Sequence, residues 1–273
     1  MVRALWTAAS GMIAQQTNVD NIANNLSNVN TLGYKTTTAE FKSLLYQTIQ
    51  AKTTSANGDN KPVGAQVGLG VRTSAITKQF SEGNLIATDN KFGFAIDGSA
   101  FFAVRGIDGE TYYTRNGNFN VARASDNTSM LCTSEGYPVL DSTGKPIVFS
   151  SDYETSKFAI ADDGRFFYKD PKTNESVDLN FKLGLYQFTN TAGLANESGT
   201  YFSATAASGP AVEESTNTNM KSSKLLQGYT EGSNVQVVDE MVNLISAQRA
   251  YEMNSKAIQA ADDMLSQANQ LKR

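Results

Sequence analysis

The side chains that most often carry out catalysis are scarce in this sequence. It contains no histidine, which removes the commonest general base and the commonest transition-metal ligand. Its single cysteine, Cys132, can form neither an internal disulfide nor a thiolate cluster. Because Cys132 stands between Leu131 and Thr133, we predict a small buried residue rather than a nucleophile.

Two pairs of acidic residues could act as the two carboxylates of a glycosidase. They are Asp239 with Glu240 and Asp262 with Asp263. Both pairs are sequential on a predicted helix and imply no cleft, whereas glycosidase carboxylates must flank the bond that is cleaved. We therefore expect surface charges at these four positions.

Two glycine-containing segments could bind a ligand. "GAQVGLGV" lacks the Gly-Lys-Ser/Thr end of a phosphate loop and leads toward a strand, so phosphate binding is not expected. "DDG", at residues 162–164, lacks the further oxygen ligands of a calcium loop and is predicted to be a turn. We predict no enzyme activity, no metal and no cofactor, and we interpret Lys35 and Arg249 as interface or surface charges.

Composition and charge exclude further classes. The net charge is −4 without a basic run, so nucleic-acid binding has no electrostatic support. No apolar run reaches the length of a membrane span. The first twenty residues lack the apolar core of a secretory signal peptide, so we expect a cytoplasmic protein or export that needs no such signal.

The elements that would position functional residues begin with an N-terminal helix. Apolar residues recur along it in steps of three, four and seven, which is typical of a helix face or a coiled-coil seam. These residues are Leu5, Met12, Val19, Ile22, Leu26 and Val29. Gly11 interrupts the pattern, either as a tolerated weak spot or as a thin patch where another backbone approaches.

A row of asparagines follows the same helix. Asn18, Asn21, Asn25 and Asn28 repeat in steps of three and four, beside the apolar row. The row is either a solvated flank or a contact surface. Asp20 is the only charged residue between Arg3 and Lys35, and amides on identical neighbouring chains can satisfy one another, so we favour contact with other helices.

A second helix is predicted from about Val235 to Leu271, a stretch without glycine or proline. One apolar row has a strict spacing of seven and a second row runs beside it, as expected of a helix that packs on several sides. The first row is Val237, Leu244, Tyr251, Ile258 and Leu265. The second row is Val242, Ile245, Met253, Ala257, Ala260 and Met264. Asn234 is the predicted N-cap, and Lys272 and Arg273 close the far end.

Pairing of the two helices alone would leave the second row and the amides in water. Isolated helices are marginal without tertiary support. We therefore predict that both ends of the lone chain are partly disordered and become ordered on assembly.

Between the helices the pattern changes to short alternating strands with glycine turns. Hairpins are predicted at Asp97-Gly98, Asp108-Gly109, Asn116-Gly117 and Asp163-Gly164. The fold class is therefore α+β, with a central antiparallel β-rich domain flanked by long terminal helices. The predicted divisions are an assembly helix at 1–34, an extended linker arm at 35–75, the β domain at 76–226 and a second assembly helix at 227–273. We expect the arm to contact neighbouring chains through Leu44, Leu45, Tyr46, Gly64, Gly68 and Gly70.

Five segments together resemble the bacterial flagellar rod and hook family. They are "SGMIAQQTNVDNIANNLSNVNTLGYK", "GLGVRTSAITKQFSEGNL", "YTRNGNF", "EGYPV" and "LISAQRAYEMNSKAIQAADDML". The similarity covers most of the chain. Within the family, "FKSLLYQTIQ" followed by "GAQVGLGV" is most similar to the distal rod class.

The resemblance implies a structural subunit of a helical tube. The terminal helices would form a coiled-coil-like inner tube that transmits torque and encloses part of the export channel. Implied partners are further copies, proximal rod and hook proteins, possible bushing ring proteins and the flagellar export apparatus. The implied location is the basal body in the cell envelope, reached by type III export without a cleaved signal peptide. A hook or proximal rod subunit, and a glycan-binding or cell-wall-hydrolysing protein, are the alternatives.

Overall fold

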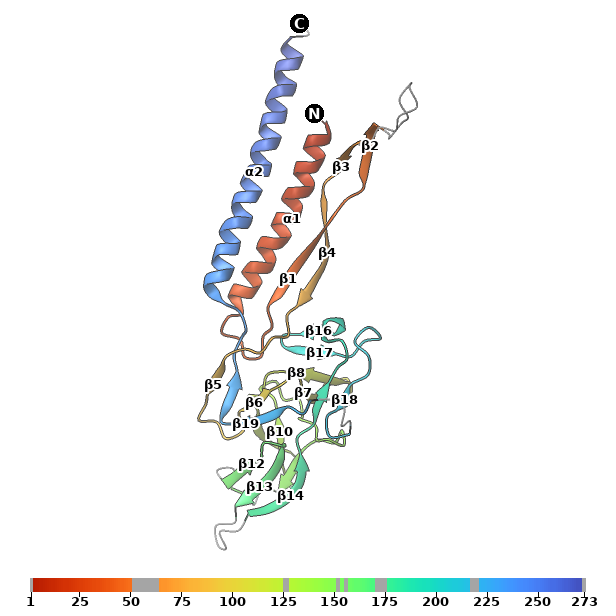
Figure 1. Ribbon diagram of the computed structural model, residues 1–273. Helices are drawn as coiled ribbons and strands as arrows, with labels where there is room; N and C mark the ends of the chain where they lie inside the picture. The colour runs from red at the N-terminus through yellow and green to blue at the C-terminus, as the bar shows by residue number, and fades with distance from the viewer. Residues whose placement is uncertain are drawn as a thin grey trace. The chain divides into compact units, whose positions relative to one another are not determined.

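The computed structural model describes residues 2–50, 64–124, 128–150, 153–154, 157–169, 176–216 and 221–271. They form two compact units (Figure 1). The helical unit comprises Met1–Ser27, Thr37–Lys78 and Gln236–Arg273. The β unit comprises Asn28–Thr36 and Gln79–Val235. The chain therefore crosses between the units four times.

The helical unit is built on two long helices that pack side by side. Helix α1 spans Val2–Ser27 and helix α2 spans Val237–Gln270. They run antiparallel, because Asn25 near the end of α1 meets Glu240 near the start of α2, while Gly11 meets Asn254 further along. Both predicted helices are confirmed.

The predicted N-cap of the second helix is wrong. The residue before α2 is Gln236, whose side chain makes no capping hydrogen bond. Asn234 instead directs its side chain to Thr36, Gln79 and Ser81. Acidic residues do occupy the first turn of α2, at Asp239 and Glu240, where the helix dipole favours them. Lys272 and Arg273 lie outside the described residues.

Four strands form a two-part ribbon beside α1. Strand β1, Thr37–Ser43, pairs antiparallel with β4, Val71–Lys78. Strand β2, Tyr46–Gln50, pairs antiparallel with β3, Ala65–Gly68. Much of the segment predicted as an extended arm therefore consists of paired strands, which we call the ribbon. Residues 51–63 of the arm lie outside the described part of the chain.

The β unit consists of short antiparallel strands. Its largest sheet has the order β16-β17-β8-β7-β15-β18, and three-stranded sheets have the orders β11-β10-β9 and β12-β13-β14. Two further pairs are β19 with β6 and β20 with β5. The bounds are β5 Leu85–Ala87, β6 Phe94–Asp97, β7 Phe101–Arg105, β8 Thr111–Thr114, β9 Asn120–Arg123, β10 Thr128–Cys132, β11 Val148–Ser150, β12 Phe158–Ile160, β13 Arg165–Lys169, β14 Ser176–Lys182, β15 Leu185–Gln187, the 3-10 helix η2 Thr191–Gly193, β16 Ala195–Ser198, β17 Tyr201–Ser203, β18 Val212–Glu213, β19 Lys224–Gln227 and β20 Tyr229–Glu231.

Aromatic side chains fill the core of the β unit. Phe102 and Phe119 meet edge to face with ring centroids 5.1 Å apart, and Phe94 packs beside Phe119 and Phe166. Edge-to-face pairs of this kind add to the free energy of area burial. Cys132 is buried in this unit, and burial raises the pKa of its thiol, as a small core residue would show. The predicted α+β class with an antiparallel β-rich part is confirmed.

Two of the four predicted hairpins are confirmed. Asp108-Gly109 joins the paired strands β7 and β8, and Asp163-Gly164 joins β12 and β13. The hairpins at Asp97-Gly98 and Asn116-Gly117 are wrong, because the strands on either side of each belong to different sheets.

Gly98 and Gly117 instead allow two backbones to approach. A Cβ on Gly117 would lie 1.8 Å from the carbonyl oxygen of Phe94. Gly98 has a φ of +141° and lies against Ser223.

Within the described residues, no helix combines the length and the apolarity needed to cross a membrane. In the same residues, no three histidine, cysteine or acidic side chains gather as a metal site would require.

Candidate assembly surfaces

Small residues are buried on both helices of the helical unit. Ala247 and Ala261 of α2 are buried, as are Ala8 and Ala14 of α1. A Cβ on Gly11 would lie 2.9 Å from the side-chain nitrogen of Asn254. Within the chain, the patch at Gly11 thus accommodates an amide side chain, whereas approach of another backbone was one of the two predicted alternatives.

The predicted apolar row of α1, which Val29 continues into the β unit, and the first predicted row of α2 are mostly half-buried in the lone chain. Ile22 is buried, whereas Tyr251 is 42% exposed and Val237 is 39% exposed. The other members are half-buried, namely Leu5, Met12, Val19, Leu26, Val29, Leu244, Ile258 and Leu265. The rows therefore contribute to the fold of the lone chain as well as to any contact with other chains.

Other apolar side chains on the two helices face water. Trp6 is 71% exposed and Ile13, one heptad later, 66%. On α2 the exposed set is Val238, Met241, Val242, Ile245, Met253 and Met264. The second predicted row contains four of these six, but sequence reasoning missed Trp6, Ile13, Val238 and Met241. The spacing of seven between Trp6 and Ile13 was the signal that could have revealed the α1 pair.

The asparagine row borders a groove of about 410 Å³ that is lined by α1, β1 and α2. Asn25 is buried and bonds to both backbone groups of Thr37. Its Nδ2 donates to the Thr37 carbonyl at 2.8 Å, and the Thr37 amide donates to its Oδ1 at 2.9 Å. Asn21 donates to the same carbonyl at 2.7 Å and accepts from the Thr37 hydroxyl at 2.6 Å. Two of the four predicted contact amides thus bond to β1. Asn28 lies in the β unit, where its Oδ1 accepts from the Thr31 hydroxyl at 3.1 Å, and Asn18 lines the groove.

Glu240 closes the groove beside Asn25. The Asn25 Nδ2 donates to its carboxylate at 3.4 Å. Burial raises the pKa of the Glu240 carboxyl, the neighbouring Asp239 adds to the rise, and the Asn25 hydrogen bond opposes it. Glu240 is thus a packed group of the helical unit, not the surface charge that we predicted.

The ribbon is seated on α1 at Gly70. Gly70 has a φ of +121°, and a Cβ there would lie 2.1 Å from the Ser10 hydroxyl oxygen. That hydroxyl also accepts a hydrogen bond from the Val71 amide at 3.3 Å. Only glycine fits both the conformation and the close approach.

The predicted contact residues of the arm lie mainly on the outer part of the ribbon. Leu45 is 85% exposed and Tyr46 61%, whereas Leu44 is half-buried. Gly64 and Gly68 are half-buried, and Gly68 adjoins the ring of Tyr46. Ile49, Val67 and Leu69 expose further apolar surface. The ribbon therefore presents apolar side chains that α1 does not cover.

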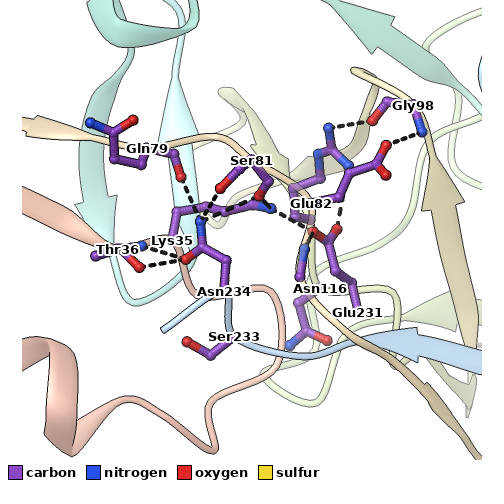
Figure 2. Close-up of polar contacts among 12 residues, drawn as sticks. Lys35, Thr36, Gln79, Ser81, Glu82, Gly98, Asn116, Glu231, Ser233 and Asn234 are labelled. Atoms are coloured by element: carbon purple, nitrogen blue, oxygen red, sulfur yellow. Dashed lines mark hydrogen bonds and ion pairs between the residues drawn. The ribbon is translucent and has the colours of Figure 1, made fainter. Parts of the chain in front are cut away.

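A group of buried charges lies inside the β unit, centred on Glu231 (Figure 2). Its carboxylate accepts from Lys35 Nζ at 2.5 Å, from Arg115 Nη1 at 3.3 Å and from the Gly83 amide at 3.0 Å. All three charged side chains are at most 2% exposed. Burial lowers the pKa of Lys35, and the adjacent Glu231 carboxylate opposes this shift.

Asn234 extends this group. Its Oδ1 accepts from the amide and the hydroxyl of Thr36, both at 2.7 Å. Its Nδ2 donates to the Gln79 carbonyl at 2.9 Å and to Ser81 Oγ at 2.9 Å (Figure 2). We call Lys35, Thr36, Arg115, Glu231 and Asn234 the polar clasp.

Sequence reasoning missed the polar clasp, and the assignment of Lys35 to an interface or the surface is wrong. Lys35 is fully buried because its ammonium group donates hydrogen bonds to the Ser81 carbonyl and to the Glu231 carboxylate. Glu231 is 196 positions away in the sequence. Nothing local in the sequence pairs these residues. The one signal available in the sequence was that glycines stand close to these charged residues. Two of these glycines are required by close backbone approach, because a Cβ on Gly33 would lie 2.5 Å from the Asn116 amide nitrogen and one on Gly83 2.1 Å from the Gly232 carbonyl oxygen. Arg249, the other cation assigned with Lys35, is exposed on α2.

Three family models match separate parts of the chain. Residues 5–35 match the model described as "Flagella basal body rod protein", and residues 95–168 match "Flagellar hook protein FlgE/F/G D1 domain". Residues 226–271 match "Flagellar basal body rod FlgEFG protein C-terminal". Each matched region contributes one charged residue to the polar clasp.

Curated relatives match over the whole length. The flagellar basal-body rod protein FlgG of Borreliella burgdorferi is 43% identical, and the match covers 100% of each chain. FlgG of Agrobacterium fabrum is 42% identical over 97% of each chain, and FlgG of Bacillus subtilis is 34% identical over 100% of each.

Proposed function

Because this chain belongs to the flagellar basal-body rod family of FlgG proteins and is thus a structural subunit of the distal rod, we propose that it works by self-assembly. Many copies polymerise into a stiff helical tube that carries motor torque to the hook. Both terminal helices line the inside of this tube, which forms part of the export channel.

The exposed apolar faces of α1 and α2 are the observation that carries this proposal. Large side chains such as Trp6 and Met253 are more than 60% exposed on the lone chain. Contiguous apolar patches of this kind mark interaction sites. Full burial of a Val, Ile or Met side chain stabilises by about 1.5–3 kcal/mol, so six such residues on α2 supply a large gross gain before ordering costs.

The ribbon supports a second kind of contact in the same assembly. A two-stranded ribbon with open edges and exposed apolar residues is marginal by itself. Leu45, Tyr46 and Ile49 are the residues we assign to contacts with neighbouring copies, where they brace the tube. The predicted apolar rows and the amides Asn18 and Asn28 remain assigned to packing between copies.

The partners and the location follow from this role. We propose that the assembled chain meets proximal rod proteins at one end and hook proteins at the other, with possible bushing ring proteins outside. It is exported by the flagellar type III apparatus without a cleaved signal peptide and acts in the basal body, without enzymatic activity. Neither a hook nor a proximal rod subunit is favoured, since the full-length relatives at 34–43% identity are FlgG proteins. The same relatives do not favour a cell-wall enzyme.

Aspartate substitutions on the exposed face of α2 test self-assembly. Met241→Asp and Met253→Asp place charges where contacts between copies are proposed, but both side chains are more than half exposed on the lone chain. We expect the thermal midpoint of the monomer to stay unchanged while filaments, counted by electron microscopy, disappear.

Met253→Leu is the matched control, because it changes the same exposed position of α2 without adding a charge. It should leave filament number as in the unmodified chain. Normal filaments from both aspartate variants would contradict the assignment of this face.

A further inference from the structure

Three of the four chain crossings between the two units start from one place in the β unit. The crossings follow Ser27, Thr36, Lys78 and Val235. Thr36 and Gln79 stand directly at the second and third crossings, and Asn234 stands one residue before Val235 at the fourth. Their hydrogen bonds to one another are therefore bonds between the chain segments that lead out of the unit.

These bonds form a closed set. The Gln79 amide donates to the Thr36 carbonyl at 2.8 Å. The Thr36 amide donates to the Asn234 side chain, which in turn donates to the Gln79 carbonyl. Each of the three segments is thus bonded to both of the others.

The buried charges connect the same segments a second time. Glu231, three residues before Asn234, accepts from Lys35 of the first segment and from the Gly83 amide of the second. Its backbone carbonyl accepts from the Gly33 amide at 2.8 Å. Arg115 of the sheet core adds a third donor to the Glu231 carboxylate. The segments are therefore anchored to one another and to the core of the unit.

We propose that the polar clasp is a load-sharing joint, which makes three of the chain crossings carry force together. This inference rests on the proposed function, in which the assembled subunit transmits torque. Bonds that are loaded in parallel must break together, whereas a single linker would yield bond by bond. Exclusion of water keeps charge-assisted bonds strong at this point.

The first arm of the test asks whether the three segments open as one. In the full chain, Asn234→Ala removes the side-chain oxygen that accepts from Thr36 and the side-chain nitrogen that donates to the Gln79 carbonyl. The amides of Gly33, Gln79 and Gly83 donate to acceptors other than Asn234, so their exchange reports coupling and not the loss of their own acceptor. We expect amide hydrogen exchange at these three positions to become at least about tenfold faster.

Asn90→Ala is the matched control. Asn90 is also half-buried in the β unit, and its side chain bonds to Asn118, Phe119 and Phe92 away from the crossings. It should leave exchange at Gly33, Gln79 and Gly83 within about twofold of the unmodified chain. Thr36→Val, which removes only the hydroxyl bond to Asn234, gives a milder second variant. Acceleration confined to Thr36 in both clasp variants would overturn the proposal.

The second arm applies load. Cells that depend on the Asn234→Ala chain should assemble rods and swim in dilute medium, but lose most of their speed in viscous medium, while Asn90→Ala cells keep theirs. Equal speeds of the two variants at high viscosity would overturn the joint. If cells with the unmodified chain formed no rods from it, the proposed function itself would be refuted. The two failures are therefore distinguishable.

Discussion

Asn25 illustrates how a single side chain can replace a strand partner. It bonds to both the amide and the carbonyl of Thr37, which stands at the start of β1. Asn21 binds the same carbonyl from one turn earlier. The Thr37 carbonyl thus has two donors, whereas its amide has Asn25 as its acceptor.

This asymmetry predicts unequal costs for two similar substitutions. Asn25→Ala leaves the buried Thr37 amide unsatisfied and should lower the free energy of unfolding by about 1–3 kcal/mol. Asn21→Ala leaves that amide bonded and should cost less. Chemical denaturation of both variants checks the order, with the exposed Gln16→Ala as control. An equal cost for all three would contradict this role of Asn25.

Two glycines of the helical unit should respond oppositely to alanine. At Gly70 the positive φ and the Ser10 hydroxyl both oppose a side chain, so Gly70→Ala should destabilise by about 1–3 kcal/mol. At Gly11 only the end of the flexible Asn254 side chain must move, and the helix gains up to about 1 kcal/mol of propensity. Gly11→Ala should therefore be neutral or mildly stabilising. Thermal unfolding of the two variants measures the contrast, which a cost at Gly11 equal to that at Gly70 would refute.

The buried Glu240 carboxyl should make the free energy of unfolding depend on pH in one direction. Burial raises its pKa in the folded chain above its ordinary value of 4.5, so the folded state binds more protons than the unfolded state between these two values. Its contribution to stability therefore increases as the pH falls through that window and is constant above it. The difference in unfolding free energy between the unmodified chain and Glu240→Gln should follow this curve. A difference that is flat with pH, or of opposite slope, would contradict the raised pKa.

At the scale of elements, periodicity predicted both helices but not their ends. Spacings of three, four and seven are local, and they locate α1 and α2 well. Asn234 has the side chain of an N-cap, yet it is engaged by Thr36 and Gln79, so α2 begins after Gln236. Tertiary hydrogen bonds decided this boundary.

The strands show the same limit. Asp108-Gly109 and Asp163-Gly164 form hairpins, since the strands that they join are neighbours in the chain as well as in a sheet. The sheet order β16-β17-β8-β7-β15-β18 brings together strands from distant parts of the chain, which alternation of residue types does not encode. For the same reason, the partner of Lys35 could not be identified from its neighbours.

We predict that the terminal helices are partly disordered in the lone chain and become ordered on assembly. We expect α1 and α2 to exchange their backbone amides rapidly in the dilute lone chain, because their exposed apolar faces lack a covering partner there. In filaments, exchange should slow by at least about a hundredfold, as measured by mass spectrometry on both forms. The β-unit core around Phe102 is the internal control, since it should be protected in both. Helices already fully protected in the lone chain would contradict this prediction.

At the scale of the whole molecule, the resemblance to a known family predicted more of the function than the periodicity and chemistry of the residues did. The family motifs identify a rod subunit, and relatives at 43% and 42% identity confirm it. The physical pattern supplied the contact faces but not their extent, as Trp6 and Ile13 show. The meeting of three matched regions at the polar clasp became visible only in the fold.

The central claim is that the terminal helices join copies of this chain into a tube. Its most direct measurement compares filament formation by the purified full-length chain and by a chain that lacks residues 1–30. Circular dichroism in the near ultraviolet shows whether the aromatic core of the β unit is still folded in the shortened chain. We predict filaments from the full-length chain and only folded monomers from the shortened one. Stiff filaments of normal diameter from the shortened chain would contradict the claim.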